Sequence, residues 1–248
     1  MVLITGASSG IGEACAKAFA ERNLDLVLVA RRLPLLDKLG RELSSRFGVR
    51  VQTVELDVSD KEGVARFAQK ESRLLSQVTV LVNNAGLAKG MATIQEGKTD
   101  DWDTMIDTNL KGLLYVTHAL LPHFTQKKSG HIVNLGSVAG HWTYPRGNIY
   151  CATKSAVHAL NEAMRLDLHG LGIRVTEISP GMVETDFSRV RLGDEEKARA
   201  VYAGLEALTA EDVAQAVVWA VDRPARVNIQ EIILYPTAQA SPTLVQRS

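Results

Sequence analysis

Short apolar runs rich in β-branched residues alternate with longer helical patterns along the whole chain. The seven runs cover residues 2–5, 25–30, 51–56, 78–83, 131–135, 174–179 and 228–235. Most are almost continuously apolar, which is typical of strands that are covered on both faces. The alternation predicts an α/β fold, a doubly wound parallel sheet of about seven strands with helices on both faces.

The chain of 248 residues contains no repeat, low-complexity run or linker, so we expect a single domain over residues 1–248. The segment 181–208 is the least regular part, with one short charged helix predicted around residues 195–202. A loop of this length in a compact domain usually has a function, and we expect it to form a lid over a site. The polar tail 237–248 is expected to order against a neighbouring subunit.

The charge balance gives no reason to expect a polyanionic partner. The chain has 28 basic and 28 acidic residues, so neither nucleic acid nor a membrane surface is expected, although a local basic patch would remain compatible with this balance. Two cysteines, Cys15 and Cys151, make neither a disulfide framework nor a zinc site, and no metal site is expected. With no long apolar run, and no room for a signal peptide before the first strand, we expect a cytoplasmic protein.

A glycine-rich turn follows the first strand and opens the first helix. It reads Thr5-Gly-Ala-Ser-Ser-Gly-Ile-Gly12. Its glycines allow a tight turn and a close approach to a pyrophosphate, and the helix N-terminus offers free N–H groups. This context predicts a dinucleotide site of the Rossmann type; a glycine turn without a ligand is the alternative.

Two arginines stand where an NAD enzyme would place a carboxylate to hold the ribose 2′-hydroxyl. The second run ends in Ala30-Arg31-Arg32. A guanidinium pairs well with a phosphate, so these residues predict a 2′-phosphate and therefore NADP. Arg31, nearer the end of the strand, is the better candidate; two solvated surface arginines are the alternative.

A tyrosine and a lysine occupy positions i and i+4 at the start of a predicted helix, in Tyr150-Cys-Ala-Thr-Lys154. They share one helix face, where the ammonium would favour the phenolate of a group whose usual pKa is about 10. The pair alone is a weak signal, because a surface pair has the same spacing. Ser137 ends a strand at the edge where ligands bind to an open parallel sheet, and Asn109 is a poor helix former inside a predicted helix.

Together these motifs resemble the short-chain dehydrogenase/reductase family. The matching pieces are residues 5–12, Leu56-Asp-Val58, Asn83-Asn-Ala-Gly86, Asn109, Ser137, Tyr150 with Lys154, and Pro180-Gly181. They occur in the order of the family and span nearly the whole chain. The resemblance implies an oxidoreductase that moves a hydride between nicotinamide and an alcohol or carbonyl carbon, and it implies a homotetramer paired through the helices of Asn109 and Tyr150.

The resemblance also implies a role for each site residue. Asn109, Ser137, Tyr150 and Lys154 would form the catalytic tetrad, with Tyr150 as the acid/base and Ser137 on the substrate oxygen. Lys154 would also bind the nicotinamide ribose, and Asn109 would hold a water that links Lys154 to solvent. The cofactor-binding residues would be Gly6, Ser8, Ser9, Gly10, Ile11, Gly12, Arg31, Arg32, Asp57, Val58, Asn84, Gly86, Tyr150, Lys154, Pro180, Gly181, Val183 and Thr185.

Three further segments are similar to the NADP-dependent 3-hydroxy acid dehydrogenases, which include serine and allo-threonine dehydrogenases and reducers of malonic semialdehyde. They cover residues 84–91, 102–109 and 187–191. The subgroup usually shows Gly-Gly before its active tyrosine, whereas this chain has Arg146-Gly147. A carboxylate substrate needs a cation, and Arg146 and Arg191 are the candidates beside Ser137 and Tyr150.

Two alternatives differ from this hypothesis. The same chemistry could act on a ketone, sugar or steroid, because specificity depends on the lid and the tail. The other alternative is a cofactor-binding regulator with a dehydrogenase-like fold. Such proteins tend to lose the tyrosine or the lysine, whereas this chain has both.

Overall fold

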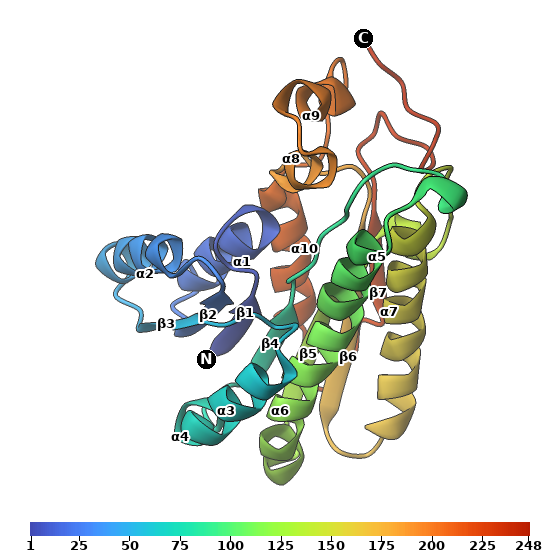
Figure 1. The fold of residues 1–248 in the computed structure, drawn as a ribbon. Coiled ribbons are helices and arrows are strands. Elements are labelled where there is room, and N and C mark those ends of the chain that lie inside the picture. Colours follow the sequence, from blue (N-terminus) through green and yellow to red (C-terminus); the bar gives the residue numbers. More distant parts are fainter.

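The computed structural model describes residues 1–248 as one seven-stranded parallel sheet with helices on both faces (Figure 1). The strand order is β3-β2-β1-β4-β5-β6-β7. The strands are β1 (Val2–Thr5), β2 (Leu26–Ala30), β3 (Val51–Glu55), β4 (Val80–Asn83), β5 (Gly130–Leu135), β6 (Ile173–Pro180) and β7 (Glu231–Leu234). The order reverses between β1 and β4, and ligands of open α/β sheets bind at such a switch point. The predicted fold class is confirmed.

The helices are named in chain order. They are α1 (Gly10–Ala20), α2 (Leu33–Phe47), α3 (Lys61–Lys70), α4 (Ser72–Leu75), α5 (Thr99–Ile106), α6 (Leu113–Lys127), α7 (Asn148–Asp167), α8 (Phe187–Leu192), α9 (Glu195–Tyr202) and α10 (Ala210–Val221). None of them is both long and apolar enough to cross a membrane. A capping box starts α10, because Thr209 Oγ1 accepts from the Asp212 amide while the Asp212 carboxylate accepts from the Thr209 amide.

Two apolar cores cover the two faces of the sheet, because successive strand side chains point to opposite faces. Val2 and Ile4 belong to the core beneath α1, α2 and α10. Leu3, between them, belongs to the core beneath α3, α4, α6 and α7. Both cysteines are buried.

The strand β7 is shorter than the predicted run 228–235 for a local reason. The side-chain oxygen of Asn228 accepts a hydrogen bond from the Val175 amide, at 3.0 Å. A side chain therefore takes the place of a strand carbonyl here, and regular pairing starts only at Glu231.

The predicted lid segment contains one helix more than expected. The expected helix is α9, and α8 precedes it. The tail contacts its own chain: Arg247 donates to the carbonyls of Val201 and Ala203, and Gln239 accepts from the Met182 amide. The tail thus contacts the lid segment of its own chain, and both lie at the same end of the molecule (Figure 1). The expected contact of the tail with a neighbouring subunit stays a prediction.

Candidate functional site

A cavity of about 460 Å³ lies at the carboxyl ends of the central strands, a volume typical of sites for small ligands. The glycine turn, the ends of β4 and β5, the start of α7, the lid segment and the tail all contribute to its wall. The residues predicted from the sequence that line it are Gly6, Ser9, Gly10, Ile11, Asn84, Gly86, Ser137, Tyr150, Lys154, Pro180, Gly181, Val183, Thr185 and Arg191. The structure therefore brings the glycine turn and the Tyr–Lys pair to one cavity.

The other predicted residues lie outside the cavity wall, mostly at the edge beyond the ends of β2 and β3. They are Ser8, Gly12, Arg31, Arg32, Asp57, Val58, Asn109 and Arg146. Val58 is buried, and its side chain would press on any Cβ added at Gly112. The Val58 side chain therefore packs inside the protein, next to Gly112.

The glycine turn packs directly on Asn84, at the end of β4. Gly6 has a φ of +66°, a conformation that strains any other residue, and the Asn84 side chain donates to the Thr5 and Gly6 carbonyls at 2.9 and 3.2 Å. A Cβ at Gly12 would collide with the Gly6 carbonyl and with Asn84. Thr185, from the segment 181–208, lies beside the turn, because a Cβ added at Gly10 would lie 3.5 Å from its side chain. The narrow turn and the start of α1 fit a dinucleotide pyrophosphate.

The two arginines have different neighbours. Arg32 donates to Ser8 Oγ at 2.9 Å and to Ser9 Oγ at 2.7 Å, so its guanidinium lies over the glycine turn. Arg31 is mostly exposed and stands 3.6 Å from Asp57. Burial acts to raise the pKa of Asp57, but hydrogen bonds from Ser59 and the Arg31 charge outweigh it and hold that pKa below its usual value. Both guanidiniums thus lie at the end of the site where a 2′-phosphate would sit.

The Tyr–Lys pair lies in the first two turns of α7, against the end of β5. The Lys154 ammonium is buried, donates to the Leu135 carbonyl at 2.7 Å and lies 6.0 Å from the centre of the Tyr150 ring. Ser137 follows β5, and its hydroxyl accepts from the Ala139 amide at 3.1 Å as the N-cap of the 3₁₀ turn η3 (Val138–Gly140). These contacts hold Ser137, Tyr150 and Lys154 on one wall of the cavity.

Asn109 lies in a π-helical segment, η2 (Asp107–Gly112), rather than in the regular helix that the sequence predicted. Its side-chain amide accepts from the Leu87 amide and donates to the Leu87 carbonyl, both at 2.8 Å, and donates to Thr153 Oγ1 at 3.2 Å. A Cβ at Gly86 would lie 3.3 Å from Asn109 Oδ1 and 3.8 Å from Lys154 Nζ. Asn109 thus joins the loop after β4 to α7, and π segments of this kind often mark functional sites.

Burial dominates the pKa values of the pair. It raises the pKa of Tyr150, as does Tyr144, whereas the hydrogen bond with Ser137 and the Arg191 charge act to lower it. Burial lowers the pKa of Lys154 to about 8, although the Glu177 carboxylate acts in the opposite direction. Burial therefore sets the direction of the pKa of Tyr150 in the free protein, and Arg191 is the cation that acts to lower this pKa. That Lys154 favours the phenolate stays a prediction.

The structure separates the two arginines predicted for the substrate. Arg191, on α8, lines the cavity with its guanidinium carbon 5.8 Å from the centre of the Tyr150 ring, and donates to the Tyr144 hydroxyl at 2.9 Å and to the Gly90 carbonyl at 3.2 Å. The side chain of Arg146 is exposed. Its φ of +66° explains why glycine suits this position in the related subgroup.

Several residues of the cavity wall were not predicted from the sequence as site residues. Tyr144 holds Arg191, and the Phe187 ring lies 5.5 Å from the Tyr150 ring. Tyr202, from α9, lines the cavity and donates to the Val183 carbonyl at 2.8 Å. Tyr144 is an aromatic residue six positions before Tyr150, but no sequence pattern distinguishes it from an ordinary loop residue.

The comparisons with known proteins agree with this geometry. A family model described as short chain dehydrogenase matches residues 1–196. The chain is 43% identical over 242 residues to an NADP-dependent 3-hydroxy acid dehydrogenase of Salmonella typhi, covering 97% of this chain and 96% of that protein. It is 46% identical over 242 residues to sulfoacetaldehyde reductase 2 of Chromohalobacter salexigens, covering 97% and 95%.

Among solved structures, the closed form of a serine dehydrogenase complexed with NADP⁺ superposes with a TM-score of 0.92 at 41% identity, covering 100% of this chain and 99% of that one. The fold, the placement of the Tyr–Lys pair and these matches together define the class. The chain belongs to the short-chain dehydrogenase family.

The buried Lys154 ammonium provides a test of the site's electrostatics. A pKa lowered from 10.5 to about 8 means that the folded protein binds fewer protons than the unfolded chain between these values, at a cost of about 3 kcal/mol near pH 7. This cost is fully present below pH 8 and is relieved as the pH rises towards 10.5. Lys154→Met removes it together with one hydrogen bond worth about 1 kcal/mol, so we expect a gain of roughly 1–3 kcal/mol in the free energy of unfolding at pH 7.

Urea unfolding of wild type and Lys154→Met between pH 7 and 10.5 measures this difference, which should shrink as the pH rises. Lys38→Met, at an exposed position of α2, serves as the control and should show no such trend. A difference between Lys154→Met and wild type that stays constant with pH would contradict the assignment.

Proposed function

We propose that this short-chain dehydrogenase is an NADP-dependent oxidoreductase that interconverts a 3-hydroxy acid and the corresponding 3-oxo acid, of the serine, allo-threonine or malonic semialdehyde type. The observation that carries the substrate class is the Arg191 guanidinium, which lines the cavity beside the Tyr150 ring. A cation in the wall of a partly apolar cavity favours a small substrate with an anionic group.

The cofactor would occupy the crevice from the two arginines to the Tyr–Lys pair. The glycine turn would hold its pyrophosphate, Arg31 and Arg32 its 2′-phosphate, and Lys154 the nicotinamide ribose. When bound, NADP supplies or accepts the hydride. The similar proteins named for NADP dependence, and the serine dehydrogenase solved with NADP⁺, support this choice of cofactor.

The residues of the tetrad divide the proton chemistry. In the reduction of a carbonyl, Tyr150 gives its proton to the substrate oxygen while Ser137 donates a hydrogen bond to the same atom. In the oxidation of an alcohol, Tyr150 takes the proton back. The raised pKa of Tyr150 keeps the phenol protonated before substrate binds, which is the state that reduction needs. Asn109 would hold the loop after β4 against α7 through its bonds with Leu87 and Thr153, next to Lys154.

A second candidate substrate class is a short aldehyde with a sulfonate group. The reductase of Chromohalobacter salexigens, named for sulfoacetaldehyde, is 46% identical to this chain. A sulfonate and a carboxylate are both small oxyanions, and both would pair with Arg191. The two classes share the hydride and proton steps and differ in the anion alone.

The enzyme would assemble as a homotetramer through α6 and α7. Leu114 on α6 and Leu166 on α7 are exposed apolar side chains of the kind that an interface covers.

Removing the phenol hydroxyl tests the proton step. Tyr150→Phe should lower kcat by about 10²–10⁴-fold, because the substrate oxygen loses its acid/base. NADPH absorbance measures turnover, and NADPH fluorescence should show cofactor binding close to that of wild type. Tyr115→Phe, on α6 and away from the cavity wall, should turn over like wild type. Turnover by Tyr150→Phe at the wild-type rate would refute the acid/base role.

Cofactor preference tests the two arginines. Arg31→Ala and Arg32→Ala should each raise the KM for NADP by about 10–100-fold, because each variant loses a charge-assisted hydrogen bond to the 2′-phosphate. The KM for NAD should stay nearly unchanged. Initial rates with both cofactors give these values. Arg41→Ala, exposed on α2, is the matched control. Equal effects on NADP and NAD would exclude recognition of the 2′-phosphate by these residues.

A substrate panel with an Arg191 variant tests the substrate class. Serine, allo-threonine, 3-hydroxyisobutyrate, 3-hydroxypropionate, sulfoacetaldehyde and simple ketones are assayed by NADPH absorbance. Arg191→Gln should raise the KM for the preferred anionic substrates by about 10–100-fold, with a much smaller effect on neutral ketones. Arg189→Gln, an exposed arginine of the same helix outside the cavity wall, is the control. A preference for neutral ketones in wild type would overturn the substrate class.

A further inference from the structure

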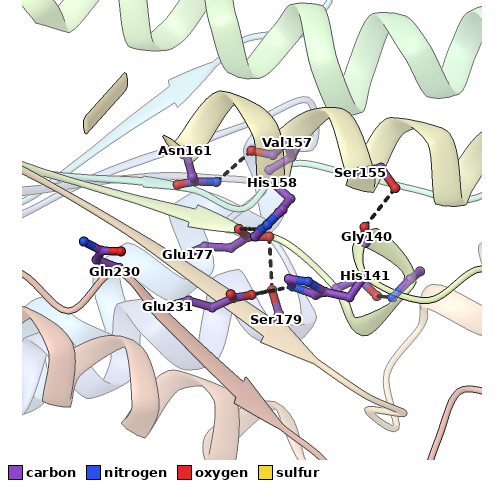
Figure 2. A network of polar contacts seen from close by, with 12 residues as sticks. Gly140, His141, Ser155, Val157, His158, Asn161, Glu177, Ser179, Gln230 and Glu231 are labelled. Atoms are coloured by element: carbon purple, nitrogen blue, oxygen red, sulfur yellow. Dashed lines mark hydrogen bonds and ion pairs between the residues drawn. The ribbon is translucent and has the colours of Figure 1, made fainter. Parts of the chain in front are cut away.

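Two histidines and two glutamates converge behind the wall that carries Ser137 and Tyr150. Figure 2 shows His158 from α7, Glu177 from β6, Glu231 from β7 and His141 from the end of η3 pointing toward one another. We call these four residues the His/Glu cluster. His141 Nε2 lies 2.5 Å from Glu231 Oε1, and His158 Nδ1 lies 2.8 Å from Glu177 Oε2.

The donor atoms of the cluster are spaced as a metal site requires. One ligand atom from each residue lies within 4.8 Å of all the others. Ligands 2.0–2.1 Å from a tetrahedral zinc stand about 3.3 Å apart. That separation falls between the two hydrogen-bonded contacts and the 4.8 Å limit, so small side-chain rotations would close the four ligands around one ion.

The charges of the cluster also favour a dication. Two neutral imidazoles and two carboxylates around a divalent ion give a neutral unit, which a buried position tolerates. The Glu177 side chain is 1% exposed, so its carboxylate needs compensation inside the protein. Ser179 Oγ lies 3.1 Å from Glu177 Oε1 and 3.0 Å from Glu231 Oε1, but its single proton serves only one of them at a time. An ion would balance both carboxylates together.

The identity of the ligands selects the metal. Imidazole nitrogens with carboxylate oxygens in a four-ligand set suit zinc, whereas magnesium and calcium prefer oxygen ligands in larger numbers. An ion would reach the cluster from outside, because the His158 and Glu231 side chains are 37% and 23% exposed. Binding requires the proton on each facing imidazole nitrogen to leave or to move to the other ring nitrogen, and no oxidant or reductant takes part.

The His/Glu cluster packs behind the cavity wall that carries Ser137, Tyr150 and Lys154, which we call the catalytic wall. A Cβ at Gly136, directly before Ser137, would collide with the Glu177 carboxylate, so this carboxylate presses against the backbone that leads into Ser137. His141 ends the turn η3 that Ser137 begins. His158 lies one helical turn beyond Lys154 on α7. An ion here would join the turn of Ser137 to the helix of Tyr150 and Lys154, and both to the strands β6 and β7.

We propose that the His/Glu cluster binds one Zn²⁺ ion per chain and that this ion acts as a structural tie behind the catalytic wall. The sequence predicted no metal site, because the His/Glu cluster contains no cysteine and its ligands are spread over 90 positions between His141 and Glu231.

The full chain is first stripped with a chelator, given one equivalent of Zn²⁺ and desalted, and its zinc content is measured by mass spectrometry of the metal. Wild type should retain one zinc per chain. Its Tm should rise by about 5–10 °C in zinc at a hundred times Kd. Co²⁺ in place of Zn²⁺ should give the visible absorption of a four-coordinate tetrahedral ion.

Two ligand variants and one control assign the site. His158→Ala and Glu231→Gln should each weaken zinc binding by about 100-fold or more and lose the rise in Tm on adding zinc. His169→Ala removes an exposed histidine just beyond α7 and should bind zinc like wild type. The Tm of each variant before zinc shows that it is folded, so loss of binding is separable from loss of structure.

Three results would overturn the proposal. The first is wild type that retains no zinc, and the second is His158→Ala that binds zinc with the affinity of wild type. The third is His169→Ala that loses zinc as fully as His158→Ala does, which would place the ion at the end of α7. Retention of NADPH turnover by the zinc-free protein is compatible with a structural tie.

Discussion

The hydrogen bond from the buried Lys154 ammonium to the Leu135 carbonyl fixes the geometry on which the candidate site depends. It joins the second turn of α7 to the last residue of β5, and two residues later the chain reaches Ser137. With Lys154 held there, Tyr150 one turn earlier can only face the same cavity. The cost of burying the ammonium is offset in part by this bond and by the Glu177 carboxylate from β6. The buried Lys154 ammonium is thus energetically unfavourable, but its hydrogen bond holds Tyr150 and Ser137 at the same cavity.

A second constraint comes from the other side of α7. The π segment around Asn109 lets a buried amide satisfy both the N–H and the C=O of Leu87, so the loop after β4 is pinned by its backbone rather than by a particular side chain. Gly86 lies between this amide and Lys154, where a Cβ would be only 3.3 Å from Asn109 Oδ1. The walls on both sides of Lys154 are therefore set by polar contacts among buried groups, which are strong when satisfied and costly when broken.

The parts that were predicted from sequence depend on contacts local in the chain or on topology. The run at residues 2–5 and the glycines after it identify a strand and a turn by their own residue types. Ser137 could be placed at the cavity because parallel strands end at one edge. The order of the motifs then brought Tyr150 to the same edge.

The features of the site that could not be predicted from the sequence depend on surroundings that no local sequence pattern encodes. Whether a tyrosine carries a raised or lowered pKa is decided by burial and by Arg191, which lies 41 residues away on α8. Arg146 and Arg191 looked equivalent in the sequence, and only the positive φ of Arg146 and the contacts of Arg191 separate them. The π segment at Asn109 has a helical pattern, so periodicity predicted a regular helix.

The His/Glu cluster lies on the side of the catalytic wall that faces away from the cavity. The front of the catalytic wall faces a cavity that must admit a cofactor and a substrate, so it cannot be stabilised by filling it with side chains. Rigidity must come from behind, and that is where Glu177 lies, with its carboxylate against the backbone before Ser137 and its hydrogen bonds to His158 and Ser179. A tie at this place holds β6 and α7 without touching the reacting atoms. The segment 181–208, which also lines the cavity, is held by the contacts of α8, α9 and the tail, so this segment and the wall of Ser137 and Tyr150 are built from separate parts of the chain.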